Sequence, residues 1–551
     1  MAQGSYIPLQ SESYHLLDRM DILDDSNFTG THMGIKPFDR AKIFRPYQKD
    51  SLNNSAMVDD GSRDDFNRNY LYKDNMEWNG GRPISPMQKP LLKIFYKEEA
   101  SLLVFNDKDF TLRINPVIQL AGGSKNSLGK YLIENRKGVE VRGTIARKVS
   151  FYTLITDNQE RLPDYGVQYA NGQFGQNNYV SVPGNTYYKP YKTDAYDYFN
   201  VRGYVNFNFL KYFDIQLGHD KNFHGNGVRS LFLSDQAAPY FFFKLNTRIW
   251  KINYQNVFAE LTHQYVRGAD QLLPKKYGVF HHLNFAVSKN LDLGLFEGVI
   301  LSRNKGFELQ YLNPIIFYRA IEQSLGSPDN AVVGADFKLN VARTAQLYGQ
   351  FLLDEFNFSE ITANNGWWGN KLGAQLGLKY IDAFKIKNLD LQGEFNMVMP
   401  YTYTHRSPAI TDSAANYTHY NQSMAHPLGA NFREIIFVIR YQPIKRLNTQ
   451  FKWFNTARGA DTTGQSWGSD IFFPASANTI PKEYGNSMMQ GYRTEVNLFE
   501  LRCSYMLYHN LFIDLHGTYR KSVSELSSLN SSEVYIGAGV RLNIARRENE
   551  Y

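Results

Sequence analysis

Apolar and polar residues alternate with a period of two in many segments of this chain of 551 residues. In the segment 199–207, every second residue is apolar or glycine, and the residues between them include Asn200 and Arg202. The segments 389–396 and 534–544 show the same alternation. Because successive side chains of a β-strand point to opposite faces, each segment has one apolar face and one polar face. Charged residues recur on the polar face, which favours a wet barrel lumen over the packed core of a sandwich.

Short and long connections alternate between these segments. The short ones are mostly basic turns near 147–148, 210–212, 248–249, 288–290, 342–344, 385–388, 443–446 and 508–510. The long ones are polar stretches near 158–196, 219–238, 263–278, 300–333, 356–370, 398–431, 456–493 and 521–533. Bacterial outer-membrane barrels have this layout, with short turns in the periplasm and long loops outside the cell.

Eight strand pairs, an opening strand near 110–120 and a closing strand near 534–544 give about eighteen strands. The predicted fold class is therefore all-β, a transmembrane antiparallel β-barrel of about 18 strands in the outer membrane of a Gram-negative bacterium. An even strand number places both ends of the barrel domain in the periplasm. The alternative is a large soluble β-array such as a propeller, but propeller strands are shorter and their connections do not alternate so regularly.

The composition agrees with a wall that is apolar on one face only. Aromatic residues make up 15% of the chain although its mean hydropathy is −0.45, as expected for a barrel with aromatic girdles. No segment approaches the roughly 20 apolar residues of a membrane helix. The single cysteine, Cys503, excludes an intramolecular disulfide and a cysteine-cluster metal site. The net charge of +7 is spread along the chain without a basic run, so nucleic acid is not an expected partner.

The first 108 residues differ from the rest and predict a periplasmic region ahead of a barrel domain at 109–551. A short amphipathic helix is predicted over 11–23 by the spacing of Tyr14, Leu17, Met20 and Leu23. The run 91–105 could form a small hairpin. The first four residues lack the apolar core of a secretory signal, so we take a signal peptide to have been removed or replaced.

Two loop segments, 218–235 and 306–330, carry dense polar signatures. With these signatures the sequence resembles the Wzi-type capsule-assembly family of outer-membrane barrels. The resemblance is strongest to the Bacteroidota branch, which includes the gliding-motility protein RemB. The segments 14–19, 35–40 and 348–356 also resemble that branch.

This resemblance covers nearly the whole chain and is densest over 197–356. It implies an eighteen-stranded barrel with a helical periplasmic start and a lumen closed by folded-in outer loops. It also implies a glycan-binding rather than a catalytic role. The C-terminus departs from the usual outer-membrane pattern, because the last strand is expected to end near Ile544 and a charged run follows before Tyr551.

The polar residues of the two signatures predict a network that anchors loops across the barrel mouth. Charges that face a narrow lumen need partners, because an unpaired buried charge is costly. The set is His219, Asp220, His224, Arg229, Asp235, Glu308, Asn313, Arg319 and Glu322. The alternative is direct contact of the set with a ligand. Imidazole also suits zinc or copper, but no third and fourth ligand follow at nearby spacing, so neither a metal nor another cofactor is predicted.

Aromatic residues among Asn, Gln and Gly mark two other loops. Flat aromatic faces beside amide side chains suit sugar rings, which present C–H patches and hydroxyl groups. The predicted glycan-binding residues are Trp367, Trp368, Tyr165, Tyr169, Tyr179, Tyr187 and Tyr188, with Phe174 and Tyr191 in the same Tyr-rich loop. The alternative, in which these aromatics pack loop on loop or lie at the membrane interface, stays open at this point.

Three functions are consistent with these features. The first is a non-enzymatic surface barrel that binds or organises exopolysaccharide or capsule. The second is an accessory component of gliding or surface-adhesin machinery that binds a protein partner, and the third is a diffusion porin. Asp354 and Glu355 could form an acid–base pair for glycoside hydrolysis, but adjacent strand residues point to opposite faces, so no enzyme is predicted.

Overall fold

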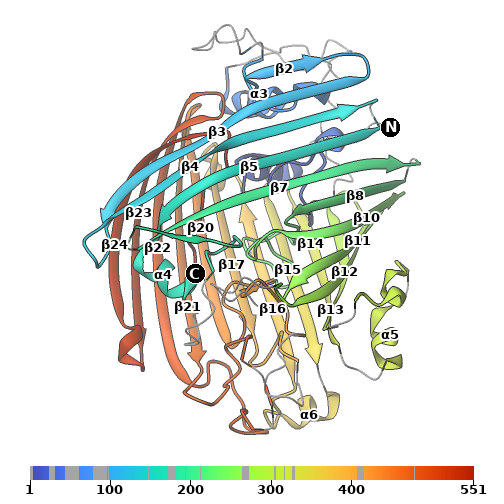
Figure 1. Ribbon diagram of the computed structural model, residues 1–551, viewed down its shortest axis with the longest axis vertical. Coiled ribbons are helices and arrows are strands. Elements are labelled where there is room, and N and C mark those ends of the chain that lie inside the picture. Colours follow the sequence, from blue (N-terminus) through green and yellow to red (C-terminus); the bar gives the residue numbers. More distant parts are fainter. Residues whose placement is uncertain are drawn as a thin grey trace.

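Eighteen antiparallel strands close a barrel (Figure 1). The computed structural model describes residues 4–23, 32–43, 61–78, 96, 98–146, 148–171, 181–192, 194–210, 212–263, 272–302, 306–315, 317–325, 329–355, 357–405, 415–473, 475–476 and 478–551. The sheet closes where the last strand pairs with the first, in a register that joins Leu542 to Ile118. The predicted fold class and strand number are therefore confirmed.

The wall strands, in chain order, are β3 (Phe110–Lys125), β4 (Tyr131–Ile145), β5 (Val149–Arg161), β7 (Ala195–Phe209), β8 (Phe213–Asp220), β10 (Tyr240–Ile249), β11 (Ile252–Thr262), β12 (Lys275–Ala286), β13 (Leu291–Leu301), β14 (Asn330–Val341), β15 (Ala345–Glu355), β16 (Lys371–Tyr380), β17 (Leu389–Val398), β20 (Phe432–Ile444), β21 (Leu447–Ala460), β22 (Tyr492–Tyr508), β23 (Leu511–Ser524) and β24 (Ser531–Leu542). A short strand, β2 (Leu103–Asn106), pairs with the start of β3. The hairpin expected within 91–105 lies partly outside the described residues, and its described end extends the wall instead.

Short turns join the strands at one end of the barrel, and most connections at the other end are long loops. We call these the short-turn end and the long-loop end. Between β14 and β15, Ala342 and Arg343 have φ angles of 52° and 56°. A two-residue type I′ turn requires positive φ at both central residues, and its twist matches that of the flanking strands.

The period-two alternation gives the wall two different faces. On the outer face, Leu293, Leu295 and Ile536 are 46%, 61% and 66% exposed. On the inner face, Asp292 and Glu394 are almost completely buried. An apolar exterior around a polar interior is the arrangement that a barrel in a lipid bilayer needs. In the described part of the chain, no helix is both long and apolar enough to cross a membrane.

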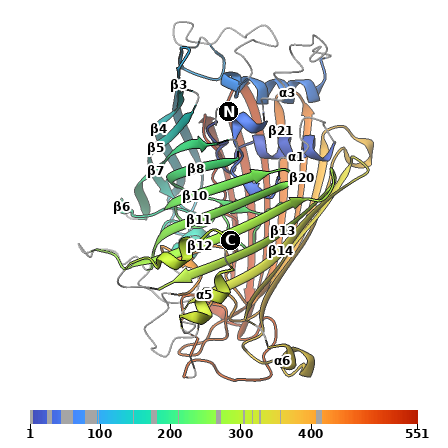
Figure 2. The same cartoon turned by 90° about the vertical axis from the view of Figure 1, so that its right-hand side faces the viewer.

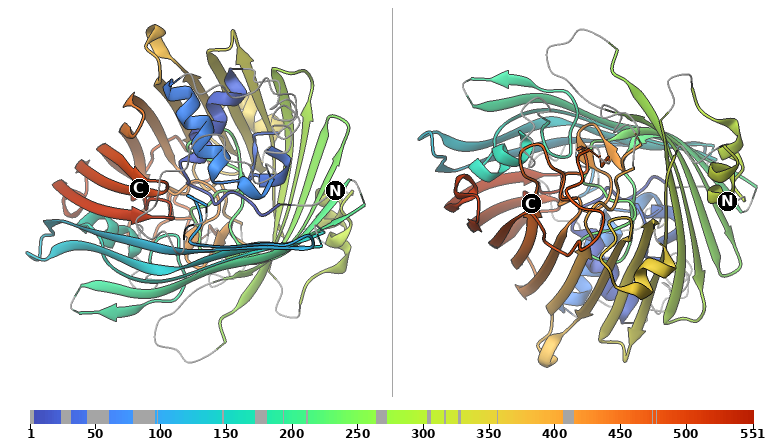
Figure 3. Two further views of the ribbon diagram at one scale, coloured as in Figure 1. Left: turned by 90° about the horizontal axis from the view of Figure 1, so that it is seen from above. Right: turned by 90° about the horizontal axis from the view of Figure 1, so that it is seen from below.

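The N-terminal region lies in the lumen and across its opening at the short-turn end (Figures 2 and 3). It contains α1 (Ser13–Ile22), β1 (Ile35–Lys36), α3 (Arg63–Lys73) and the 3₁₀ turn η1 (Met76–Trp78). The helix expected over 11–23 is thus confirmed as α1. The helices α1 and α3 and the turn η1 share a small core, and α1 is tied to the wall by ion pairs of Asp18 with Lys379 and of Asp21 with Lys338.

Candidate functional site

Two loops fold inward from the long-loop end and fill the middle of the lumen. One is 221–239, between β8 and β10, which we call the plug loop; the other is the described part of 399–431, between β17 and β20. Three consecutive side chains of the plug loop are fully buried, those of Leu231, Phe232 and Leu233. They belong to a hydrophobic core that also includes inward residues of the wall strands.

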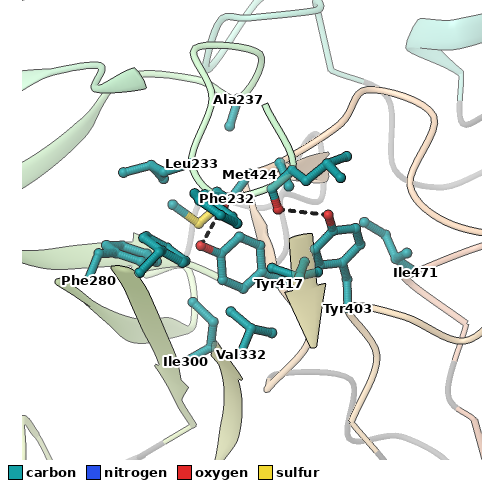
Figure 4. Close-up of a cluster of buried hydrophobic side chains, with 14 of the residues drawn as sticks. Phe232, Leu233, Ala237, Phe280, Ile300, Val332, Tyr403, Tyr417, Met424 and Ile471 are labelled. Atoms are coloured by element: carbon teal, nitrogen blue, oxygen red, sulfur yellow. Dashed lines mark hydrogen bonds between the residues drawn. The ribbon is translucent and has the colours of Figure 1, made fainter. Parts of the chain in front are cut away.

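The contacts of this core join the two loops to each other and to the wall (Figure 4). The ring of Phe232 stacks on Phe296 of β13 with 4.6 Å between the centroids. From the second loop, the hydroxyls of Tyr403 and Tyr417 donate hydrogen bonds of 2.8 Å to the carbonyls of Leu231 and Phe232. Buried hydroxyls that are satisfied in this way fix one arrangement of the loops, because an unsatisfied partner would be costly.

Arg229 connects the plug loop to the wall and to the C-terminal end of the chain. Its guanidinium lies 3.3 Å from a carboxylate oxygen of Glu434 on β20 and 5.0 Å from the centre of the Phe454 ring. It also donates a hydrogen bond of 2.5 Å to the carbonyl of Glu550. Burial acts to lower the pKa of Arg229, but Glu434 and Glu550 hold it above its ordinary value. The charge is therefore retained inside the lumen.

The other residues of the first signature lie on different sides of the wall. Asp220, His224 and Asp235 face the lumen, where Asp235 accepts a hydrogen bond of 3.0 Å from Gln10 of the N-terminal region. His224 belongs to β9 (Phe223–His224), which pairs with β1 inside the barrel. Burial lowers the pKa of His224 to about 3. His219 lies on β8 with its side chain on the outer face, away from the plug loop.

The residues after β24, 543–551, turn back into the lumen and form a C-terminal tail (Figure 1). Arg547 pairs with Glu160 of β5 at 3.0 Å, and Glu548 pairs with Lys452 of β21 at 2.9 Å. Tyr551 stacks on Tyr169 with 4.0 Å between the ring centroids. The sequence analysis missed this role of the tail. The available signal was its run of two arginines and two glutamates over 546–550, which suits a polar lumen better than the end of a wall strand.

The second signature lies against the outside of the wall, not across the mouth as expected (Figures 1 and 3). Residues 306–315 and 317–325, which we call the outer strap, contain η2 (Leu309–Leu312) and α5 (Tyr318–Ser324). The strap buries Tyr311 and Tyr318 on outward residues of β11 to β14. The carboxylate of Glu297 accepts hydrogen bonds from the backbone N–H groups of Tyr318 and Arg319 at 3.0 and 2.9 Å.

The strap covers polar groups that an outer wall would otherwise turn toward lipid. Asn256, His281 and Glu297 all point outward from β11, β12 and β13, yet each is at most 6% exposed. The opposite face of the strap presents Leu309 and Ile315, which are 76% and 86% exposed. The strap thus replaces a polar patch of the wall by an apolar surface. Within it, Arg319 pairs with Glu322 at 2.9 Å, Glu308 is half-buried and Asn313 is exposed.

We expect Glu297→Ala to release the outer strap, because the variant leaves two backbone N–H groups of α5 without their carboxylate. Hydrogen bonds to a charged group contribute about 1.5–3 kcal/mol each, so local opening should increase by about tenfold or more. Limited trypsin digestion of the purified protein in detergent measures this opening. Mass spectrometry quantifies the cleavage after Arg319. Glu260→Ala is the matched control, since Glu260 lies on the same outer face in an exposed pair with Lys275. Equal cleavage in both variants would contradict the anchoring role of Glu297.

Most of the predicted glycan-binding aromatics are covered by protein. Trp368 is 6% exposed and packs edge-on against Tyr401 with 5.8 Å between the centroids. Tyr165 and Tyr188 are 5% and 4% exposed and lie in cores that face the lumen. Tyr169 is half-buried under the ring of the C-terminal residue.

Two of the predicted set remain accessible, Tyr187 at 52% exposure and the half-buried Trp367. Tyr191, in the same loop as Tyr187, is also half-buried. Tyr179 and Phe174 lie outside the described residues.

The helix α6 (Phe358–Ala363) lies at the tip of the long-loop end (Figures 1 and 2). Trp367 follows α6 in the same loop, before β16. Backbone hydrogen bonds of 2.8 Å from Gly485 and Asn486 to the carbonyls of Asn365 and Gly366 join its loop to the loop 461–491. We call the joined surface the aromatic tip and define it by Trp367, Trp467, Tyr484, Asn365, Asn486 and Lys482.

The aromatic tip carries exposed rings beside amide and charged groups. Tyr484 is 48% exposed and Trp467 is half-buried, with the ammonium of Lys482 5.9 Å from its ring centre. Chemically this arrangement offers stacking faces, amide donors and acceptors, and a cation. The sequence analysis missed Trp467 and Tyr484. Their signal was present, because Gly464, Gln465, Ser466 and Gly468 flank Trp467 much as Asn and Gly flank Trp367.

No family model and no curated protein matches the sequence. Among solved structures, Wzi from Escherichia coli, an outer-membrane protein involved in group 1 capsule assembly and a carbohydrate-binding β-barrel, has a TM-score of 0.56 at 11% sequence identity. The match covers 99% of this chain and 100% of that chain. OprD of Pseudomonas aeruginosa and OccAB2 of Acinetobacter baumannii have TM-scores of 0.41 at 10% and 9% identity, over 78% of this chain and 95% and 97% of theirs. At 11% identity the likeness to Wzi is one of fold, and this chain has the fold of an outer-membrane β-barrel.

Proposed function

We propose that this protein is a non-enzymatic outer-membrane barrel that binds surface polysaccharide at its long-loop end. The observation that carries the proposal is the aromatic tip, where Trp367, Trp467 and Tyr484 are accessible among amide side chains. Aromatic faces pack on the C–H patches of sugar rings, and amides exchange hydrogen bonds with sugar hydroxyls. Wzi, which shares the fold, is itself described as a carbohydrate-binding barrel.

In this proposal the long-loop end faces the outside of the cell and the N-terminal region faces the periplasm. The usual layout of bacterial barrels supports that orientation, since long loops are extracellular and short turns periplasmic. The apolar outer wall and the exposed leucines and isoleucine of the outer strap would contact membrane lipid. Membership of the Bacteroidota branch and a role in gliding or surface-adhesin machinery stay predictions.

The occupied lumen argues against the diffusion-porin alternative. The plug loop, the second inward loop, the N-terminal region and the C-terminal tail all occupy space through which solutes would have to pass. Buried hydrogen bonds and ion pairs hold these segments to one another and to the wall.

The proposal is tested by capture of polysaccharide on the purified protein. The full-length protein, immobilised in detergent, is incubated with exopolysaccharide shed by the cells that produce it, and bound sugar is quantified after washing. Saturable binding that excess free polymer displaces is the expected result. Sugar retention equal to that of beads carrying an unrelated barrel would contradict the proposal. If proteins from the same cells were retained in place of sugar, the accessory-component alternative would replace it.

A further inference from the structure

A cavity of about 170 Å³ lies in the lumen between the wall strands β4, β5 and β7, the N-terminal segment and the C-terminal tail. Its volume is below the roughly 300–1,000 Å³ of pockets for drug-sized ligands, so it suits a small molecule. Arginine and lysine side chains outnumber carboxylates in its described lining, by eight to five. Neutral polar groups, including those of Thr156, Asn158 and Asn200, line the cavity where it meets the wall strands.

Five of the cations are neutralised by carboxylates within 3.2 Å. These pairs are Arg40 with Asp74, Arg142 with Glu77, Arg541 with Asp514, Arg546 with Glu12, and Arg547 with Glu160. The pairs connect the N-terminal region, the wall and the tail, so they account for how the lumen contents are held together.

The remaining three cations are Arg136, Arg202 and Lys221. Among the described residues, Arg136 on β4 and Arg202 on β7 each lie 3.8 Å from a carboxylate oxygen, that of Glu134 and that of Asp220. In the same described set, Nε and Nη2 of Arg136 and Nε of Arg202 are buried without a hydrogen-bond partner. Lys221 is 6% exposed and donates a hydrogen bond of 2.9 Å to the backbone carbonyl of Asp235.

Nearby carboxylates compensate these cations only in part, since those of Glu134 and Asp220 lie 3.8 Å from Arg136 and Arg202. Taking a charge out of water is costly unless it is paired, and unmade hydrogen bonds of a buried guanidinium add to that cost. Burial and the neighbouring Arg202 lower the pKa of Lys221 to about 7, as expected where positive charge is crowded. Guanidinium groups recognise carboxylate, sulfate and phosphate oxygens through paired N–H donors.

We propose that this cavity binds a small oxyanion, with Arg136, Arg202 and Lys221 as its ligands. The hydroxyl and amide groups around it accommodate a hydroxylated anion, such as a single sugar acid, as well as an inorganic one. The site does not depend on the proposed surface function, because it is inside the lumen and shares no residue with the aromatic tip.

Isothermal titration calorimetry on the full-length protein in detergent, in chloride buffer, tests the proposal with sulfate, glucuronate and glucose as probes. Binding of sulfate or glucuronate with no binding of glucose is the expected result. Tighter binding of sulfate identifies a site for an inorganic anion, and tighter binding of glucuronate identifies a site for a sugar acid. Arg136→Gln with Arg202→Gln should weaken that binding by about a hundredfold, since the loss of each charge-assisted contact costs about tenfold or more. Arg493→Gln is the matched control, because Arg493 forms an exposed pair with Glu495 at the long-loop end.

Circular dichroism and heat-modified gel migration establish whether each variant is folded. If the double variant does not fold, the single variant Arg202→Gln should still bind the anion about tenfold more weakly than the wild type. The proposal is overturned if neither anion binds the wild type, or if the folded variants bind as tightly as the wild type. A Trp367→Ala, Trp467→Ala variant should keep full oxyanion binding, so failure of this site and failure of the surface function are distinguishable.

Discussion

The intact protein should conduct little or no current when it is reconstituted in planar lipid bilayers. An eighteen-stranded barrel is wide enough for an aqueous channel unless something fills it. Here Leu231, Phe232 and Leu233 form part of a hydrophobic core in the middle of the lumen. Steady conductance on the scale of a general porin would contradict this closure and favour the diffusion-porin alternative.

Arg229→Ala should turn this closed barrel into one with frequent transient openings. The change leaves Glu434 buried without its guanidinium partner and removes the link to Glu550. Removing one partner of a buried pair costs about 3–5 kcal/mol, enough to raise the open population by roughly two to almost four orders of magnitude. Single-channel recording measures the openings, and Arg229→Lys should restore part of the closure.

The control for that experiment is Arg493→Ala, which also removes an arginine from a pair with glutamate. Arg493 and Glu495 are both about half exposed, and an exposed pair contributes only about 0–1 kcal/mol. Its openings should therefore equal those of the wild type. Equal openings in the Arg229 and Arg493 variants would show that Arg229 does not hold the plug loop.

The wall of the barrel was predictable because period-two alternation is a local property of the sequence. In a strand, Leu293 and Leu295 must point to one face and Asp292 to the other, independently of how the rest of the chain folds. The spacing of turns then determined the number of strands. The same reasoning found α1, because its apolar residues recur at a helical period.

The courses of the loops were not predictable in this way. A signature such as that around Glu308 and Arg319 shows that a loop needs partners, but not whether those partners face the lumen or the lipid. The decisive residue is Glu297, a carboxylate on the otherwise apolar outer face of β13, and it identifies the outer wall as the partner. The inserted tail depends likewise on Glu160 and Lys452, which are distant in sequence.

Burial also separates aromatic residues that look equivalent in the sequence. Trp367 and Trp368 are adjacent, yet Trp368 is fixed against Tyr401 and below the ammonium of Lys371, whereas Trp367 stays half exposed. Composition predicted an aromatic loop surface, and only the packing of loop on loop determines which rings a ligand reaches.

Trp367→Ala combined with Trp467→Ala should release polysaccharide from the cell surface while the barrel stays folded. Each lost aromatic contact costs about 0.5–1.5 kcal/mol, so the two together lower single-site affinity by roughly 5- to 150-fold. A long polymer that contacts several copies of the barrel is retained multivalently, so under the proposed function its retention should fall more steeply than the affinity of one site. Polysaccharide in the cell-bound and shed fractions is quantified at equal protein level, and Tyr484→Ala should add to the release.

Trp368→Ala is the contrasting variant because the same chemical change occurs at a buried ring. Deleting a buried tryptophan side chain costs about 3–5 kcal/mol through the cavity that it leaves. Its expected effect is a loosened loop with a lower midpoint of thermal unfolding or faster proteolysis. Loss of polysaccharide in that variant should follow the loss of loop structure, whereas in the Trp367, Trp467 variant it should occur without such a loss.

These two variants separate recognition from packing at the aromatic tip. If sugar rings stack on Trp367 and Trp467, retention falls in the double variant although its proteolysis pattern is that of the wild type. Unchanged retention at normal protein level would remove the reason for placing the glycan site there, and Tyr187, which is 52% exposed in another loop, would become the remaining described candidate of the predicted set. Loss of folded barrel in the double variant would instead assign both rings to packing, because a surface contact with a ligand contributes nothing to the stability of the free protein.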